Sequence, residues 1–137
     1  MKVLVATDGS ENSMKAVRRA LELAEKEEAE ITLMSVAYFG KGDFDDMPPR
    51  IQEKLERQAR NALERAKIIF EERGIKVQTI LETGVVPANN IIGRAKDDGF
   101  DLILMGSTGI TGLERVLMGS TAAKVVGHAP CSVSVIR

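Results

Sequence analysis

One segment of this sequence, residues 106–121, is rich in glycine and in side chains with hydroxyl groups. Glycine has no Cβ, so backbone N–H groups beside it can approach a ligand closely. At Gly119-Ser120-Thr121 the pattern becomes that of a helix start, where the first amides lack partners and carry partial positive charge. This combination suits an anion such as phosphate. The residues predicted to form the anion site are Met105, Gly106, Ser107, Thr108, Gly109, Ile110, Thr111, Gly112, Gly119, Ser120 and Thr121.

The connection formed by this segment has about a dozen residues, whereas a loop between a strand and a helix usually has about two to six. A surface loop with glycines at its turns is the alternative interpretation. Two familiar phosphate motifs do not occur: the sequence has no Gly-Lys-Ser/Thr, and no G-x-G-x-x-G. A P-loop NTPase and a nicotinamide-dependent dehydrogenase are therefore not indicated.

A second polar group, Thr7-Asp8-Gly9-Ser10, follows the apolar run that opens the chain. Asp8 could accept a hydrogen bond from a ribose hydroxyl, or reach a magnesium ion carried by phosphates. The alternative is a helix N-cap, a role for which Ser10 and Asn12 are also suited. No residue is assigned a catalytic role.

Short apolar runs alternate with amphipathic stretches along the whole chain, which predicts an α/β fold with a parallel sheet and helices on both faces. The predicted strands span residues 2–7, 31–36, 77–82, 101–105 and 131–136. The predicted helices span residues 11–28, 51–70, 87–98 and 120–126.

The polarity of the strands indicates their order. A central parallel strand is covered on both faces and should be apolar at every position, as residues 3–6 and 102–105 are. The strands at 77–82 and 131–136 contain polar residues and fit the edges. The order 3-2-1-4-5 satisfies this pattern better than the flavodoxin-like order 2-1-3-4-5. The winding then reverses between strands one and four, where ligands of open α/β sheets bind.

Composition excludes several classes of protein. Nineteen basic and 20 acidic residues give a net charge of -1, which argues against binding nucleic acid through bulk positive charge. A single cysteine, Cys131, permits no internal disulfide, and with a single histidine a His/Cys zinc site is not expected. No apolar stretch is long enough to span a membrane, and the opening run is too short for a signal peptide. We therefore expect a cytoplasmic protein without a nucleic-acid or membrane partner.

The glycine pattern resembles that of the universal stress protein family. Gly106-x2-Gly109-x9-Gly119-Ser120 matches the G-2x-G-9x-G-[S/T] ATP-binding motif of that family. The Thr-Asp-Gly-Ser that follows the first strand and the His-Ala-Pro-Cys that precedes the last are also similar. The resemblance covers residues 1–137, which we expect to form one domain. It implies a five-stranded sheet of order 3-2-1-4-5 and membership of the ATP-binding subclass.

The resemblance also implies roles for individual residues. Ala6, Thr7 and Asp8 correspond to the loop near ribose and adenine, and Val36 to the strand end that reads the adenine edge. The phosphate loop and the helix start correspond to Gly106, Ser107, Gly109, Gly112, Gly119, Ser120 and Thr121. At position 6 some ATP-binding members have proline, but the contact there would come from the backbone. Ser132 also stands where proline is frequent.

The resulting hypothesis is an ATP-binding protein with a regulatory or signalling role in stress, with magnesium accompanying the phosphates. The first rival is a slow metal-dependent ATP hydrolase or phosphotransferase. The glycine-rich connection contains no lysine and only Arg115 as a cation, which disfavours a fast enzyme. The second rival is a flavodoxin-like redox carrier, for which four Phe, one Tyr and no Trp leave little to stack on a flavin.

A homodimer through the fifth strand is the remaining expectation. The edge strand at 131–136 has no internal charge or proline to prevent pairing with another strand. Two copies could pair antiparallel about a two-fold axis. The resemblance implies the same arrangement, since many members of the universal stress protein family dimerise through this strand. The alternative is a monomer whose terminal strand is shielded by the neighbouring helix.

Overall fold

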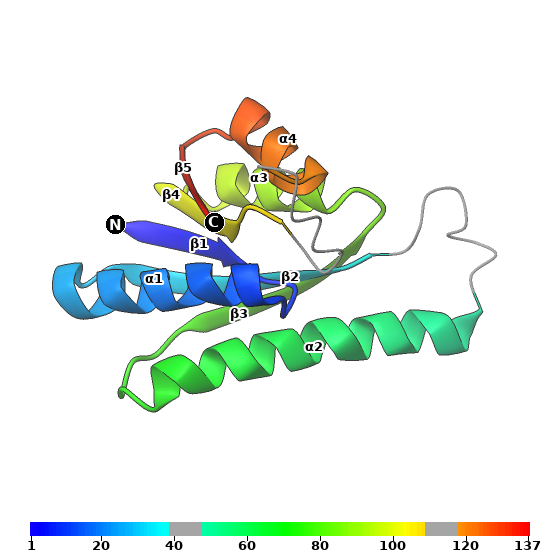
Figure 1. Ribbon diagram of the computed structural model, residues 1–137, viewed down its shortest axis with the longest axis horizontal. Helices are drawn as coiled ribbons and strands as arrows, with labels where there is room; N and C mark the ends of the chain where they lie inside the picture. The colour runs from blue at the N-terminus through cyan, green and yellow to red at the C-terminus, as the bar shows by residue number, and fades with distance from the viewer. Residues whose placement is uncertain (39–47, 109–117) are drawn as a thin grey trace.

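The computed structural model describes residues 1–38, 48–108 and 118–137 (Figure 1). Five parallel strands form one sheet in the order β3-β2-β1-β4-β5. The strands are β1 (Lys2–Ala6), β2 (Glu30–Tyr38), β3 (Gln78–Gly84), β4 (Leu102–Gly106) and β5 (Ser132–Ile136). The order predicted from strand polarity is confirmed, and the flavodoxin-like order is excluded.

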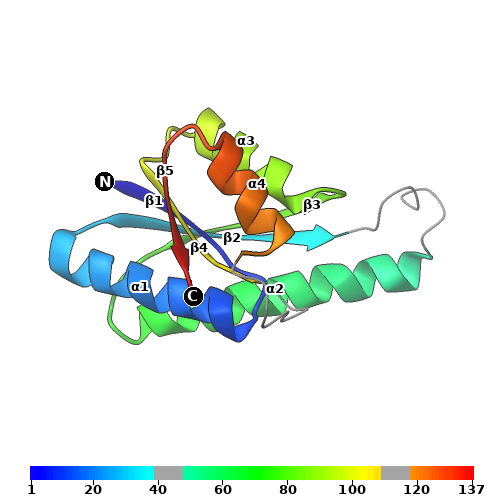
Figure 2. The ribbon, with the colours of Figure 1, turned by 45° about the horizontal axis from the view of Figure 1, so that its top comes forward.

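The sheet is covered by a pair of helices on each face (Figures 1 and 2). The helices are α1 (Glu11–Glu27), α2 (Pro49–Glu71), α3 (Pro87–Asp97) and α4 (Ser120–His128). Helices α1 and α2 share one hydrophobic cluster with the sheet, and α3 and α4 share another. The chain therefore leaves β1 toward one face and β4 toward the other. Ligands of open α/β sheets bind at such a switch point, beyond the C-terminal ends of the two strands, and we call this place the crevice.

Strand β1 shows why the centre of the sheet must be apolar. Val3, Leu4 and Val5 are completely buried. Val3 and Val5 belong to the cluster under α1 and α2, while Leu4 belongs to the cluster under α3 and α4. Successive side chains of a strand point to opposite faces, so each residue of β1 meets a covered surface.

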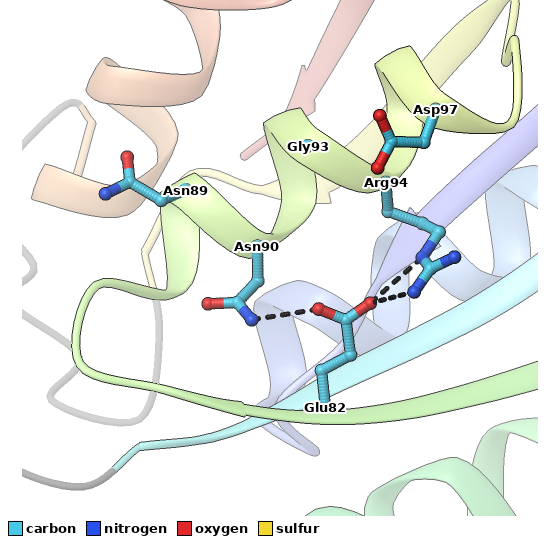
Figure 3. A pocket seen from close by; sticks show the side chains of 6 residues that line it. All are labelled: Glu82, Asn89, Asn90, Gly93, Arg94 and Asp97. Atoms are coloured by element: carbon cyan, nitrogen blue, oxygen red, sulfur yellow. Dashed lines mark hydrogen bonds and ion pairs between the residues drawn. The ribbon is translucent and has the colours of Figure 1, made fainter.

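Strand β3 lies at the edge of the sheet, and its one charged residue, Glu82, is bonded to α3. The Glu82 carboxylate accepts hydrogen bonds from Arg94 Nε (2.9 Å), Arg94 Nη2 (2.7 Å) and Asn90 Nδ2 (2.9 Å) (Figure 3). These groups line a depression between β3 and α3, together with Asn89, Gly93 and Asp97. The charge in this strand is therefore matched by its own neighbouring helix.

The elements lie where the sequence predicts them, with ends that differ by one or two residues, as β2 and α4 illustrate. Strand β2 continues beyond Val36 to Tyr38, because the pairing with β3 continues to Tyr38 opposite Gly84. Helix α4 continues beyond Val126 to His128, which adds the last turn before Ala129. Periodicity alone locates the middle of an element better than its ends.

Candidate functional site

The loop after β1 is anchored by two buried hydroxyl groups. Thr7 donates its backbone N–H to the Met34 carbonyl (2.9 Å), continuing the contact between β1 and β2. Its Oγ1 lies 2.9 Å from Ser13 Oγ, and each residue is 4% exposed. Ser13 was not among the predicted site residues, although a serine on the apolar stripe of a helix is a signal that it has a buried partner.

Asp8 lies in the exposed turn that leads into α1. Its Oδ1 accepts a hydrogen bond from the Ser10 N–H (2.9 Å), and its own N–H donates to Ser13 Oγ (3.3 Å). The helix N-cap is Ser10, whose side chain accepts from the Ser13 N–H. Of the three cap candidates, Ser10 takes the role, while the Asp8 carboxylate stands at the crevice end of β1.

Gly9 gives this turn a backbone conformation that favours glycine. Its φ of +86° lies in the left-handed region, which favours glycine. The Arg65 guanidinium of α2 donates to the Gly9 carbonyl (3.0 Å), and a Cβ at this position would collide with the same guanidinium. The turn is thus held from α1 by Ser13 and from α2 by Arg65.

The loop after β4 begins in close contact with α1. A Cβ built on Gly106 would lie 2.7–2.9 Å from backbone atoms of Asn12 and Ser13. Glycine at this position therefore allows the first turn of α1 to pack against the end of β4. Sequence reasoning assigned Gly106 to ligand approach, and the packing of α1 is a separate requirement that a single sequence does not reveal.

Ser107 joins three elements at the crevice. It is 4% exposed, its N–H donates to the Ile136 carbonyl of β5 (2.8 Å), and its carbonyl accepts from the Gly119 N–H (2.6 Å). Gly119 is the N-cap of α4, and none of the side chains that the structure describes caps that helix start. The two ends of the glycine-rich connection, Ser107 and Gly119, are therefore bonded to each other beside the first amides of α4, at Ser120 and Thr121.

Other predicted residues fall on both sides of this point. Ala6 pairs with Met34 at the end of β1, and Val36 follows two residues further along β2. Both are partly buried against the hydrophobic cluster under α3 and α4. Met105 is 5% exposed and belongs to that same cluster, so only its backbone could face a ligand. Thr108 is within hydrogen-bond reach of the Asn12 side chain.

Part of the predicted site lies outside the described residues. These positions are Gly109, Ile110, Thr111, Gly112 and Arg115. Within the described ranges, no group of three or more His, Cys, Asp and Glu side chains is arranged to hold a metal ion. Nor does any helix in those ranges combine the length and the apolar composition needed to cross a membrane.

The single histidine and the single cysteine of the chain lie near the connection between α4 and β5. His128 is exposed in the last turn of α4, and Cys131 is half-buried just before β5. Burial, with a smaller contribution from the negative charge of Asp101, raises the pKa of the Cys131 thiol. A raised pKa reduces the thiolate fraction, which fits a packing role better than a redox role.

Comparisons with known proteins agree along the full chain. A family model described as the Universal stress protein family matches residues 1–137. Universal stress protein MJ0531 of Methanocaldococcus jannaschii is 38% identical over 99% of this chain and 81% of its own length. Universal stress protein YxiE of Bacillus subtilis is 33% identical over 99% of this chain and 98% of its own length.

Solved structures show the same fold. Hypothetical protein MJ0577 has a TM-score of 0.84 at 30% identity, covering 98% of this chain and 94% of that one. A universal stress protein in complex with cAMP has a TM-score of 0.74 at 23% identity, covering 100% and 97%. The one from Archaeoglobus fulgidus in complex with dAMP has a TM-score of 0.73 at 20% identity, covering 100% and 98%. The family match over residues 1–137, with relatives above 30% identity and this shared fold, means that the chain belongs to the universal stress protein family.

Proposed function

We propose that this protein binds an adenine nucleotide, ATP with magnesium, in the crevice between β1 and β4. The observation that carries the proposal is the bond from the Gly119 N–H to the Ser107 carbonyl. It brings the start of α4, which no described side chain caps, beside the end of β4, where open α/β sheets bind their ligands. An uncapped helix start offers N–H donors and partial positive charge to a phosphate.

The described residues suggest how the nucleotide would lie. Ala6 and Val36 offer an apolar surface for the base, and Thr7 and Asp8 stand beside it for the ribose. The phosphates would meet the backbone of Met105 and Gly106 and the residues Ser107, Thr108, Gly119, Ser120 and Thr121. We assign Gly109, Ile110, Thr111 and Gly112 to the same phosphate group from the sequence motif. Asp8 is the proposed contact for phosphate-bound magnesium.

Two adenine nucleotides are named in the comparison structures, cAMP in one and dAMP in the other. Both proteins share this fold, so the fold accommodates an adenine ring and its sugar. The motif Gly106-x2-Gly109-x9-Gly119-Ser120 is the reason for proposing ATP here, because its spacing matches the ATP-binding motif of the family.

We infer a regulatory role in the stress response rather than rapid turnover. Fast phosphoryl transfer needs a group that orients the nucleophile and cations that stabilise the charge. Among the described residues at the crevice, Asp8 is the one candidate base, and Arg65 is committed to the Gly9 carbonyl. Slow hydrolysis is the second candidate function, and the exposed carboxylate of Asp8 is the observation that favours it.

The binding test is calorimetric titration of nucleotide-free protein with ATP, ADP, AMP and adenosine, with and without magnesium. We expect ATP to bind more tightly than adenosine, because the phosphates add contacts. Failure of every adenine compound to bind would overturn the proposal.

Phosphate release from bound ATP, followed in parallel, should stay far below about 10 per second, a typical enzyme rate. A rate in that range, abolished by Asp8→Asn with binding intact, would favour the hydrolase.

We also propose that two copies pair through β5. Among the described strands β5 pairs with β4 alone, and residues 132–136 include neither charge nor proline. Val126 of the adjacent α4 is 47% exposed.

Sedimentation equilibrium should give twice the 14.9 kDa chain mass. Val135→Pro should shift the protein toward monomer by removing a backbone donor from the edge. A wild-type mass that stays at one chain up to high concentration would contradict the dimer.

A further inference from the structure

A side chain of α1 makes a hydrogen bond to the loop that follows β4. Asn12 occupies the second position of α1, and its Nδ2 donates a hydrogen bond to Thr108 Oγ1. The two residues are 96 positions apart in the sequence. This bond connects the first turn of α1 with the start of the glycine-rich connection.

The surrounding backbone fixes both ends of this bond. On one side, the first turn of α1 is held by its Ser10 cap and packs directly on Gly106. On the other side, Ser107 is bonded to Ile136 and to Gly119, which holds the backbone immediately before Thr108. The approach of Asn12 to Thr108 is thus set by the packing of α1 against β4, rather than by two loose surface side chains.

The direction of the bond determines what Thr108 can offer a ligand. A hydroxyl group has one proton to donate and two lone pairs that accept. Because Asn12 Nδ2 donates to Thr108 Oγ1, the hydroxyl proton of Thr108 is directed elsewhere. A hydroxyl that already accepts a hydrogen bond is also polarised, which strengthens its own donation. Thr108 is therefore prepared as a donor, and a donor suits an anion.

We propose that Asn12 is a positioning residue, which presents the Thr108 hydroxyl as a hydrogen-bond donor to a phosphate group of the bound nucleotide. This inference rests on the proposed function and adds a residue that the sequence motif does not contain. It also assigns a specificity role to Thr108: the hydroxyl contributes to binding of nucleotides that carry phosphate and adds nothing to binding of adenosine.

The decisive variant is Asn12→Asp, tested by titration with ATP and with adenosine. A carboxylate at position 12 accepts the Thr108 proton and adds a negative charge near the phosphates. Loss of a hydrogen bond to a charged group corresponds to about a tenfold to hundredfold weaker affinity. We expect that loss for ATP and less than about twofold for adenosine. The matched control is Asn89→Asp, the same change at an exposed position in the first turn of α3.

Variants of both partners separate positioning from folding. Thr108→Val should weaken ATP binding as Asn12→Ala does, and Thr108→Ser should retain it. If Asn12 acts through Thr108, adding Asn12→Ala to Thr108→Val should cause no further loss. Circular dichroism and thermal melting establish that each variant is folded.

Three outcomes would overturn the inference. Equal losses for ATP and adenosine in Asn12→Asp would mean that the residue only supports the fold. Unchanged ATP affinity in folded Asn12→Asp and Thr108→Val, while the wild type binds ATP, would refute the role of Asn12 and leave the nucleotide site standing. A wild type that binds no adenine nucleotide would refute the proposed function, and this inference with it.

Discussion

Two polar regions of this molecule lie at the C-terminal parts of its strands, and they are built from different chemistry. The crevice between β1 and β4 is lined by hydroxyls, glycines and backbone amides, among them Thr7, Ser107 and Gly119. The depression between β3 and α3 is lined by charged and amide side chains centred on Glu82 and Arg94 (Figure 3).

The two regions differ in which of their hydrogen-bonding groups are paired with one another. In the depression, the Glu82 carboxylate takes both Arg94 and Asn90, and the pairing with Glu82 raises the pKa of Arg94. The charges there satisfy one another. In the crevice, the internal bonds fix the backbone, while no side chain within the described ranges caps the first amides of α4. A region whose internal bonds hold the loops and still leave donors at a helix start is prepared for an anion.

The largest expected effect is on the crevice itself, from Gly119→Val. A Cβ at Gly119 would lie 3.3 Å from the Ser107 carbonyl oxygen, so the start of α4 must shift. We expect about a hundredfold weaker ATP affinity, because the added side chain and the displaced helix start disturb the proposed phosphate contacts, and this loss corresponds to about 2.8 kcal/mol. Calorimetry provides the measurement. Gly127→Val is the matched control in the same helix, because a Cβ there meets nothing within 4 Å. Equal affinity in both variants would remove Gly119 from the site.

The second prediction concerns the contribution of the buried Thr7–Ser13 hydroxyl pair to the stability of the fold. Ser13→Ala removes the hydroxyl that is bonded to Thr7 Oγ1 and that accepts from the Asp8 N–H. The free energy of unfolding should fall by about 1–3 kcal/mol, measured by urea denaturation. Lys15→Ala, at an exposed position of α1, serves as the control and should change it by less than about 0.5 kcal/mol. A Ser13→Ala protein as stable as the control would mean that the hydroxyl pair adds nothing.

The smallest effect is expected in the depression, from Glu82→Gln. The pair is partly exposed, with side-chain exposures of 33% for Arg94 and 23% for Glu82, so its loss should cost about 0.5 kcal/mol at low salt. At 1 M salt the screening length is about 3 Å, and the cost should disappear. The cost of Ser13→Ala should persist in the same salt. Altered ATP affinity in Glu82→Gln would contradict the separation of the two regions.

The sequence alone predicted the frame of the molecule better than the contacts within it. Strand order followed from polarity because burial on two faces leaves no room for residues such as Glu82 in a central strand. Asn12 and Thr108 are different, since their contact depends on how closely α1 packs on β4. The role of Arg65 at Gly9 was equally hidden, because it comes from a helix that the turn does not adjoin in the chain.

The position of β1 has a consequence for how the protein matures during synthesis. β1 is made first, but it pairs with β4 through Val3 opposite Leu102, so half of its hydrogen-bonding edge waits for a segment made much later. The crevice therefore does not exist in a nascent chain that lacks β4 and α4. A ligand that binds there stabilises only the completed fold, by mass action. Nucleotide occupancy would then distinguish finished molecules from those still being made.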